Sequence, residues 1–273
     1  MVVSLYDAGM KDTFFWQKLI LEASKIDYGE PLPNLDKTFL SVWSRHYHRI
    51  TSLASIHAPL LEIGAGYGIL AAGLAVQTIG PIWATEHPSR KYVTKNDYRQ
   101  FLKARGVHLV LQDLREGLPF QSESFQQVYC CDVIEHLLPG VLGKALSEMS
   151  RVLIPEGELI ISTPNLYRLG NLFRFITGYS INPPASVQQI GNTWGHIREF
   201  TMKEVRSLLE SYGFETLECV FERNPYFTAD AFGHENVFSS RTAKWINRIN
   251  HVLRGITPCL GDEMFLLCRR KTQ

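Results

Sequence analysis

Short apolar runs alternate with amphipathic segments over most of this chain. From residue 58 onward, the apolar runs end in polar residues, and helical spacing of apolar side chains follows most of them. This order is typical of a parallel α/β domain, whose sheet is buried between two layers of helices. The runs that predict strands lie at residues 60–63, 82–86, 107–113, 127–131, 158–162, 214–220 and 264–268.

Helical spacing predicts the remaining elements. After the first strand it favours helices at 68–78, 141–153 and 202–212, the last opened by a capping box of Thr201 and Glu204. Before that strand, two amphipathic helices are separated by a segment rich in Gly and Pro at 29–33. We therefore divide the chain into an N-terminal helical extension, residues 1–57, and an α/β domain, residues 58–273, with insertions at about 166–195 and 223–258.

The aromatic residues of the N-terminal extension have two interpretations. We favour packing on the edge of the sheet. The alternative is a lid over a ligand, in which Trp43, Arg45, His46 and Tyr47 approach the site. In the second insertion, apolar residues at helical spacing within 245–253 predict a further helix, for which packing is favoured over contact with a membrane surface.

Composition narrows the classes of function. The chain has 273 residues, 45% of them hydrophobic, and 28 Lys and Arg against 27 Asp and Glu give a net charge of +1. This balance gives no reason to expect nucleic acid as a partner. We find neither a signal-peptide pattern nor an apolar run of membrane-spanning length, and the 5 cysteines follow no metal-binding or disulfide spacing. We expect a cytoplasmic monomer or homodimer with reduced thiols.

A glycine-rich turn follows the first predicted strand. Glu62 lies near the end of that strand, and Gly64, Gly66 and Gly68 come at alternate positions before the next helix. Glycines allow positive φ and close approach of a ligand to the backbone, and the helix N-terminus offers N–H groups. The third glycine comes one position too early for the dinucleotide fingerprint G-x-G-x-x-G, and the Glu62 carboxylate would repel a pyrophosphate. The turn therefore favours a nucleoside ligand that carries positive charge.

Polar side chains also end the later strands. Glu86 lies 22 positions after Gly64, close to the spacing of about 20 at which an acid binds ribose hydroxyls. Asp113 ends the third predicted strand. Glu135 and His136 follow the fourth, at the edge where open α/β sheets bind ligands. A carboxylate beside an imidazole suits acid–base chemistry or metal binding.

Several motifs together resemble the class I S-adenosylmethionine (SAM) methyltransferases, in particular the branch that includes ubiquinone-biosynthesis O-methyltransferases. They are E-x-G-x-G-x-G at 62–68, D-V-I-E-H-L at 132–137, S-T-P-N at 162–165 and H-x-R-x-F-T at 196–201. The resemblance covers residues 58–220 and the region 262–270. It implies a Rossmann-like sheet with strand order 3-2-1-4-5-7-6, an antiparallel strand seven, N-terminal helices and an insertion after strand five.

The resemblance also implies a ligand and its site. SAM would bind as the methyl donor and leave as S-adenosylhomocysteine (SAH), with Asp113 facing the adenine amino group. A role of Asp113 in capping the next helix remains the alternative. The residues implied to bind the cofactor are Glu62, Gly64, Ala65, Gly66, Gly68, Glu86, His87, Asp113, Leu114, Cys131 and Asp132.

Three residues are candidates for the chemistry: Glu135, His136 and His196. We favour His136 or His196 as the general base for a hydroxyl acceptor, with Glu135 holding the imidazole tautomer. The alternative, implied by relatives with E-x-x-E-H and a distant His, is a divalent metal ion. Asp132 argues against the metal because it is one methylene shorter than the Glu of that motif. We expect His196 to lie near the Glu135–His136 pair.

The expected function is methyl transfer from SAM. O-methylation of a small-molecule, sugar or lipid-linked acceptor is favoured over N- or C-methylation, because a neutral hydroxyl needs a base. Two other classes of function remain. The first is an NAD-dependent oxidoreductase on a similar sheet, against which Glu62 and the early glycine argue. The second is a SAM-binding but inactive partner subunit. The sequence leaves the acceptor open.

Overall fold

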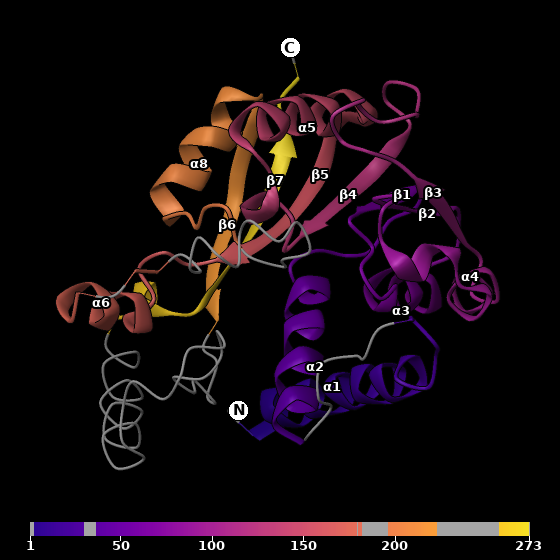
Figure 1. The fold of residues 1–273 in the computed structure, drawn as a ribbon, viewed down its shortest axis with the longest axis horizontal. Coiled ribbons are helices and arrows are strands. Elements are labelled where there is room, and N and C mark those ends of the chain that lie inside the picture. The colour runs from indigo at the N-terminus through magenta and orange to yellow at the C-terminus, as the bar shows by residue number, and fades with distance from the viewer. Residues whose placement is uncertain (1–2, 30–36, 179, 182–195, 223–256, 273) are drawn as a thin grey trace.

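The structure is a computed structural model that describes residues 3–29, 37–178, 180–181, 196–222 and 257–272. Within these residues seven strands form one sheet, and helices cover both of its faces (Figure 1). The strands are β1 (Leu60–Ile63), β2 (Ile82–Glu86), β3 (Val107–Leu111), β4 (Phe125–Cys131), β5 (Leu153–Pro164), β6 (Phe214–Glu222) and β7 (Glu263–Arg270). The helices are α1 (Val3–Ala23), α2 (Lys37–Ser52), α3 (Ile69–Gln77), α4 (Asn96–Lys103), α5 (Pro139–Val152), α6 (Leu169–Ile176) and α8 (Met202–Ser211), with short 3-10 turns η1 (Lys91–Thr94), η2 (Ile134–His136) and η3 (Pro258–Leu260).

The strand order is β3-β2-β1-β4-β5-β7-β6. Neighbouring strands from β3 to β5 pair in parallel, whereas β7 is antiparallel to both β5 and β6. The predicted order and the antiparallel seventh strand are therefore confirmed. The carboxyl ends of β1, β2, β4 and β5 consequently meet at one edge of the sheet, which is where ligands bind in open α/β folds.

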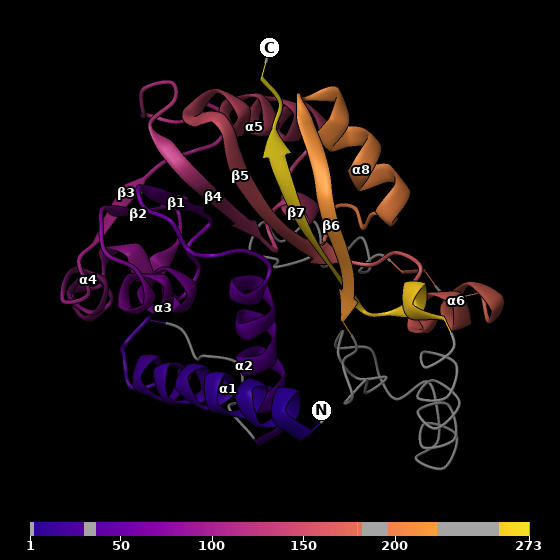
Figure 2. The same cartoon turned by 180° about the vertical axis from the view of Figure 1, so that it is seen from behind.

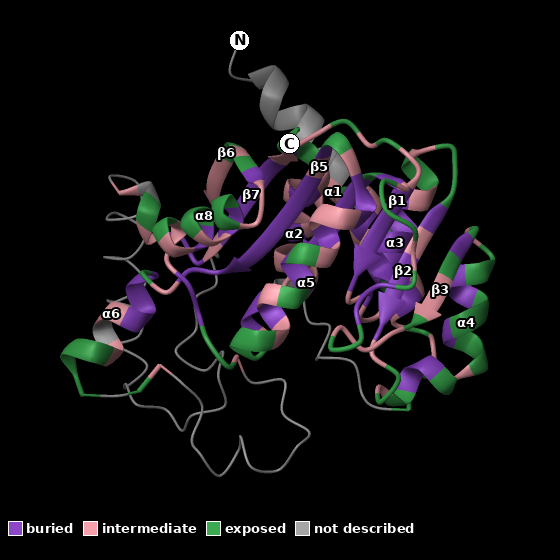
Figure 3. Cartoon of the chain, turned by 90° about the horizontal axis from the view of Figure 1, so that it is seen from above, coloured by how far each residue is buried: buried purple, intermediate pink, exposed green. Residues whose placement is uncertain are grey.

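Two hydrophobic cores lie on opposite faces of the sheet. Leu60 and Ile160 belong to the core beneath α1 and α3, whereas Leu61 and Ile161 belong to the core beneath α5 and α8. Successive strand residues point to opposite faces, so a sheet buried on both faces needs apolar residues at consecutive positions. Figure 3 shows the resulting buried strands between helices whose outer surfaces are exposed.

The N-terminal helices lie on the same side of the sheet as α3, because Trp16 and Ile50 belong to the core that contains Leu60 and Ile160 (Figures 1 and 2). Helix α1 packs closely on α3, because a Cβ added at Gly73 would come within 2.1 Å of the Trp16 ring. Trp16 is buried and contacts Tyr47 of α2, with 5.2 Å between ring centroids. Trp16 thus packs on α3 and on Tyr47, over one face of the sheet rather than on its edge. The lid interpretation stays a prediction.

Two strand boundaries differ from the predictions. β3 ends at Leu111, two residues before Asp113, because Asp113 Oδ1 accepts a hydrogen bond from Arg115 N at 2.9 Å and forms a turn instead. β5 begins at Leu153 rather than at residue 158. The pairing of β4 with β5 shifts register between Leu153 and Glu158, where Glu156 has φ 62°.

Three further predictions concern helices. The capping box of Thr201 and Glu204 at the start of α8 is confirmed, with both of its hydrogen bonds formed. The helix predicted within residues 245–253 lies outside the described residues, as do parts of both insertions. Among the helices that the structure describes, none has the length and apolar character needed to cross a membrane.

Candidate functional site

The glycine-rich turn joins β1 to α3. Gly64, Gly66 and Gly68 have φ of 75°, 53° and 75°, and Gly68 is the N-cap of α3. A Cβ at Gly64 would lie 2.6 Å from the Val133 side chain, and one at Gly68 would lie 2.8 Å from Leu102. At Gly66 the nearest atom is Gly64 O, at 4.0 Å. Gly64 and Gly68 are therefore required by packing, whereas Gly66 leaves its outer side open for a ligand.

Glu62 lies beneath this turn. Its side chain is buried, and its Oε2 atom has no hydrogen-bond partner among the described residues. Burial raises the pKa of this carboxyl well above its usual range. A positively charged ligand nearby would favour the ionised form, so this position fits the ammonium and sulfonium of SAM. Ala65, the next cofactor-binding prediction, donates its N–H to Thr85 O at 2.9 Å and thereby fixes the turn on β2.

Glu86 ends β2 and is bonded to the same turn. Its Oε2 accepts from Gly66 N at 2.7 Å and from the Tyr92 hydroxyl at 3.2 Å, while Oε1 accepts from His87 N at 2.7 Å. The carboxylate is 6% exposed, which differs from a solvated acid at a strand end. Burial raises its pKa, and the bonds from His87 and Gly66 oppose that rise. Glu86 thus shapes the turn even without a ligand.

Asp113 and His87 lie together near the ends of β3 and β2. His87 Nε2 is 3.3 Å from Asp113 Oδ2. The Arg115 Nε atom donates to both oxygens of Asp113, at 3.0 and 2.8 Å, and these bonds hold the pKa of the carboxyl well below its usual range. If Asp113 and Leu114 contact adenine as predicted, Asp113 would do so while it is paired with Arg115.

The end of β4 carries Cys131 and Asp132. Burial raises the pKa of the Cys131 thiol. Asp132 has φ 56° and accepts a hydrogen bond from the Ser162 hydroxyl at 2.8 Å. Its Oδ2 lies 3.0 Å from His46 Nε2 of helix α2, an ion-pair contact. Burial alone would lower the pKa of His46, but the Asp132 charge outweighs it and raises this pKa.

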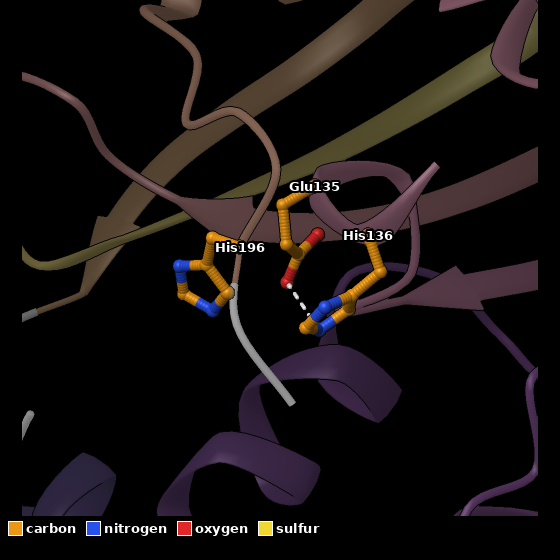
Figure 4. Close-up of side chains that lie close together, drawn as sticks. All are labelled: Glu135, His136 and His196. Atoms are coloured by element: carbon orange, nitrogen blue, oxygen red, sulfur yellow. Dashed lines mark ion pairs between the residues drawn. The ribbon is translucent and has the colours of Figure 1, made fainter. Parts of the chain in front are cut away.

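The three residues expected to carry the chemistry are brought together, as Figure 4 shows. One ligand atom each from Glu135, His136 and His196 lies within 4.8 Å of the others. The rings of His136 and His196 are 5.2 Å apart between centroids, so the predicted proximity is confirmed. Glu135 Oε1 is 3.9 Å from His136 Nε2, which is an ion-pair distance and too long for a hydrogen bond. Glu135 therefore does not hold the His136 tautomer by a hydrogen bond.

Glu199 is the carboxylate that holds an imidazole here, and sequence reasoning missed it. Its Oε1 is 3.0 Å from His196 Nδ1 and 2.5 Å from a guanidinium nitrogen of Arg168. Its Oε2 accepts from Asn171 at 2.7 Å. Burial opposes ionisation of Glu199, but the bond from His196 and the Arg168 charge outweigh it and lower its pKa. The three-residue spacing of His196 and Glu199 was the available signal.

Buried acids complete the site. Thr163 donates its hydroxyl to Glu135 Oε2 at 3.0 Å, while Oε1 of Glu135 is buried and has no hydrogen-bond partner among the described residues. Burial raises the pKa of Glu135 and of Glu263 well above the usual range, and the charge of Asp132 adds to both shifts. Glu263 begins β7, and only its position beside Pro164 of β5 brings it here. No sequence signal pointed to it.

Comparisons with known proteins agree with this geometry. The family described as "Methyltransferase domain" matches residues 61–161, the segment from the glycine-rich turn to β5. Among curated proteins, none matches the chain.

Solved structures share the fold at low identity. A Galdieria sulphuraria protein described as a sarcosine dimethylglycine methyltransferase has 17% identity and a TM-score of 0.56, over 96% of this chain and 98% of that one. The methyltransferase solved with the Haloferax volcanii Trm112 activator has 13% identity and a TM-score of 0.57, over 83% and 88%. The [4+2]-cyclase SpnF has 16% identity and a TM-score of 0.58, over 97% of both chains.

The cyclase shows that this fold alone does not determine a reaction. The family match is more specific, because it spans the turn, both strand-end acids and the D-V-I-E-H-L segment. SAM is the cofactor that this family uses. The chain therefore carries a class I SAM-dependent methyltransferase domain of the family that matches residues 61–161.

Proposed function

We propose that the protein methylates a hydroxyl group on a small-molecule, sugar or lipid-linked acceptor. SAM supplies an electrophilic methyl group on a sulfonium, and Glu62, Gly66 and Glu86 would hold it. As the acceptor oxygen forms its bond to the methyl carbon, the bond from that carbon to sulfur breaks, SAH leaves with the electron pair, and the hydroxyl proton passes to a base. A neutral hydroxyl therefore needs a base. The histidines at the site can supply one, and their presence favours oxygen over nitrogen or carbon as the acceptor.

The contact between His196 and Glu199 carries this proposal. The Nδ1–H of His196 donates to the carboxylate at 3.0 Å, which leaves Nε2 as the nitrogen that accepts a proton. Glu199 stays ionised because Arg168 and Asn171 bond to it, so its charge stabilises the imidazolium that forms. Among our two candidates, His196 is thus better arranged than His136 to act as the base.

The test is a methyl-transfer assay with a panel of acceptors and SAM. We expect His196→Ala to lower kcat by about 10²–10⁴-fold, the usual worth of a positioned base, with the Kd of SAM unchanged. His108→Ala is the matched control, because His108 is exposed on the edge strand β3 and stacks on Trp83. Full activity of His196→Ala would remove the base assignment. If only the amines of the panel are methylated, the acceptor atom is nitrogen and the proposal of an oxygen acceptor is wrong.

A metal-assisted reaction is the second candidate. Glu135 Oε1 is a buried carboxylate oxygen without a hydrogen-bond partner among the described residues, and His136 and His196 offer ligand atoms within 4.8 Å. The Glu199 contact would orient a metal-bound His196 equally well. Base catalysis predicts activity that survives EDTA and falls on acidification. Activity lost to EDTA and restored by a divalent ion would favour the metal.

Protein partners are a separate question. The Haloferax volcanii relative is described in a complex with a methyltransferase activator. If this chain binds SAM but transfers no methyl group to any acceptor, a required partner subunit becomes the better explanation. The oligomeric state of this protein and its cytoplasmic location stay predictions.

A further inference from the structure

Three tyrosines converge on the glycine-rich turn from outside it. Tyr28 follows α1, Tyr92 lies in η1 and Tyr98 lies in α4. Their side chains are 1%, 1% and 0% exposed. The ring centroids of Tyr28 and Tyr92 are 6.0 Å apart, and those of Tyr92 and Tyr98 are 5.2 Å apart. We call these three residues the tyrosine cluster.

Each hydroxyl of the tyrosine cluster bonds to the turn or to its acid. Tyr98 donates to Gly66 O at 3.0 Å, and Tyr28 donates to Tyr67 O at 3.1 Å. Tyr92 donates to Glu86 Oε2 at 3.2 Å, the same oxygen that accepts from Gly66 N. Gly66 is thus fixed at both its N–H and its C=O, and the next carbonyl is fixed as well.

Packing alone does not explain these hydroxyls. Phenylalanine would fill the same space, and a buried hydroxyl destabilises a core unless it finds a partner. All three hydroxyls find that partner at the place where the ligand is expected. Bonds to β2 and packing at Gly64 and Gly68 fix the ends of the turn, whereas Gly66 between them is open on one side. Bonds from outside the turn therefore help to hold the peptide groups of Gly66 in one orientation.

Tyr28 connects the turn to the N-terminal extension. The neighbouring Asp27 forms an ion pair with Lys95 at 2.8 Å, and Glu22 of α1 forms one with Arg105 at 2.8 Å. The end of α1 is therefore held against both ends of α4, which carries Tyr98. The extension is bonded to the turn without belonging to the matched family segment.

We propose that Tyr28, Tyr92 and Tyr98 are positioning residues of the cofactor site, which hold the Gly66–Tyr67 backbone and the Glu86 carboxylate in the orientation that binds SAM. This inference rests on SAM being the ligand of the turn. It predicts that loss of a hydroxyl weakens cofactor binding although the ring remains. Once SAM saturates the enzyme, the turn is held by its ligand, so kcat is retained while the KM for SAM rises.

The experiment compares Tyr28→Phe, Tyr92→Phe and Tyr98→Phe with Tyr129→Phe. Tyr129 is the matched control, because it is 1% exposed and donates its hydroxyl at 3.3 Å to Gln127, which pairs with Leu60 at the start of β1. Calorimetry with SAH gives Kd, and urea denaturation gives stability. We expect Tyr28→Phe and Tyr98→Phe each to raise Kd about 5-fold, the worth of one neutral hydrogen bond, and their double variant to raise it further. Tyr92→Phe should raise Kd at least as much, because its hydroxyl bonds to the Glu86 carboxylate. Tyr129→Phe should keep Kd within 2-fold, or about 0.4 kcal/mol, of the wild type.

An unchanged Kd in Tyr28→Phe and Tyr98→Phe, with a stability loss like that of Tyr129→Phe, would overturn the proposal. If a variant does not fold, hydrogen exchange on the wild type decides instead: SAH should slow exchange in residues 24–29 and 92–98, and unchanged exchange there would contradict the inference. A wild-type protein that binds no SAH would overturn the proposed function first, and this inference with it.

Discussion

The candidate site has two sides that are built differently. The cofactor side comprises the Glu62–Gly68 turn, Glu86 and Asp113, all from one continuous stretch of chain. The acid–histidine side comprises Asp132, Glu135, His196, Glu199 and Glu263, with His46 against it, and its residues come from segments far apart in sequence. The cofactor side depends on backbone conformation and the acid–histidine side on buried charge, so substitutions should affect the two sides in different ways.

The largest effect is expected on the acid–histidine side. Arg168→Ala leaves Glu199 as a buried charge without its guanidinium, which should lower the free energy of unfolding by about 3–5 kcal/mol. Arg198→Ala is the control, because the Arg198–Glu204 pair is 57% and 41% exposed against 6% and 3% for Arg168–Glu199. Its loss should be at most about 1 kcal/mol. Equal losses in urea denaturation would contradict this division between the two pairs.

Two glycines test the cofactor side. Gly64→Ala combines a left-handed φ with a contact 2.6 Å from Val133, and should lower stability by about 2–4 kcal/mol. Gly66→Ala has only the φ penalty of about 1–2 kcal/mol but places a methyl group where SAM would approach. Thermal unfolding and SAH calorimetry should therefore rank the two variants in opposite orders. The same ranking in both measurements would mean that the ligand does not approach Gly66.

Glu86 should matter for both binding and the turn. Glu86→Ala should weaken SAH binding by about 1.5–3 kcal/mol, the worth of hydrogen bonds to a charged group. Because Glu86 is buried and bonded to Gly66 N, stability should also fall, by about 1 kcal/mol. Calorimetry and urea denaturation measure the two losses, with the exposed Glu116→Ala as control. An unchanged SAH Kd would refute the ribose role.

The smallest effect is a pH dependence at His46. Its pKa is raised in the folded protein, so its contribution to stability is present below the unfolded value of about 6.5 and is lost as pH rises through the folded value. The pKa of Asp132 is lowered: burial opposes ionisation but the His46 charge prevails, so its contribution is lost as pH falls through the folded value. His46→Gln should therefore lower the free energy of unfolding by about 1 kcal/mol at a pH between the folded pKa values of Asp132 and His46, and by less on either side of that range. A stability difference independent of pH would show that the pair is not ionised.

The strands and the turn that form the cofactor side could be predicted almost completely from the sequence, while the roles of its residues in binding stay predictions. The ends of β1 and β2, the alternating glycines and Glu86 follow from local periodicity and spacing, which need no knowledge of distant contacts. Burial of Glu86 was not predictable, because it depends on Tyr92 and on Gly66 turning toward it. The strand order was available only through the family resemblance.

The acid–histidine side was predictable only in part. His196 was expected beside Glu135 and His136 because a shared motif placed it there, and this was confirmed. The contact of His46 with Asp132 and the position of Glu263 depend on how α2 and β7 pack, which no local pattern encodes. Glu199, and not Glu135, is the acid that orients an imidazole, because the Glu199–His196 contact is 3.0 Å and the Glu135–His136 contact is 3.9 Å. Sequence spacing cannot predict a difference of 0.9 Å.

The place of β7 in the sheet has a consequence for biosynthesis. β7 follows β5 and β6 along the chain but lies between them, and among the described strands β6 pairs only with β7. While a ribosome has made the chain only as far as β6, the edge of β5 stays open and β6 has no neighbour, which exposes backbone groups that can pair with other chains. Completion of the sheet, and arrival of Glu263 at the site, must wait until residues 263–270 have left the exit tunnel.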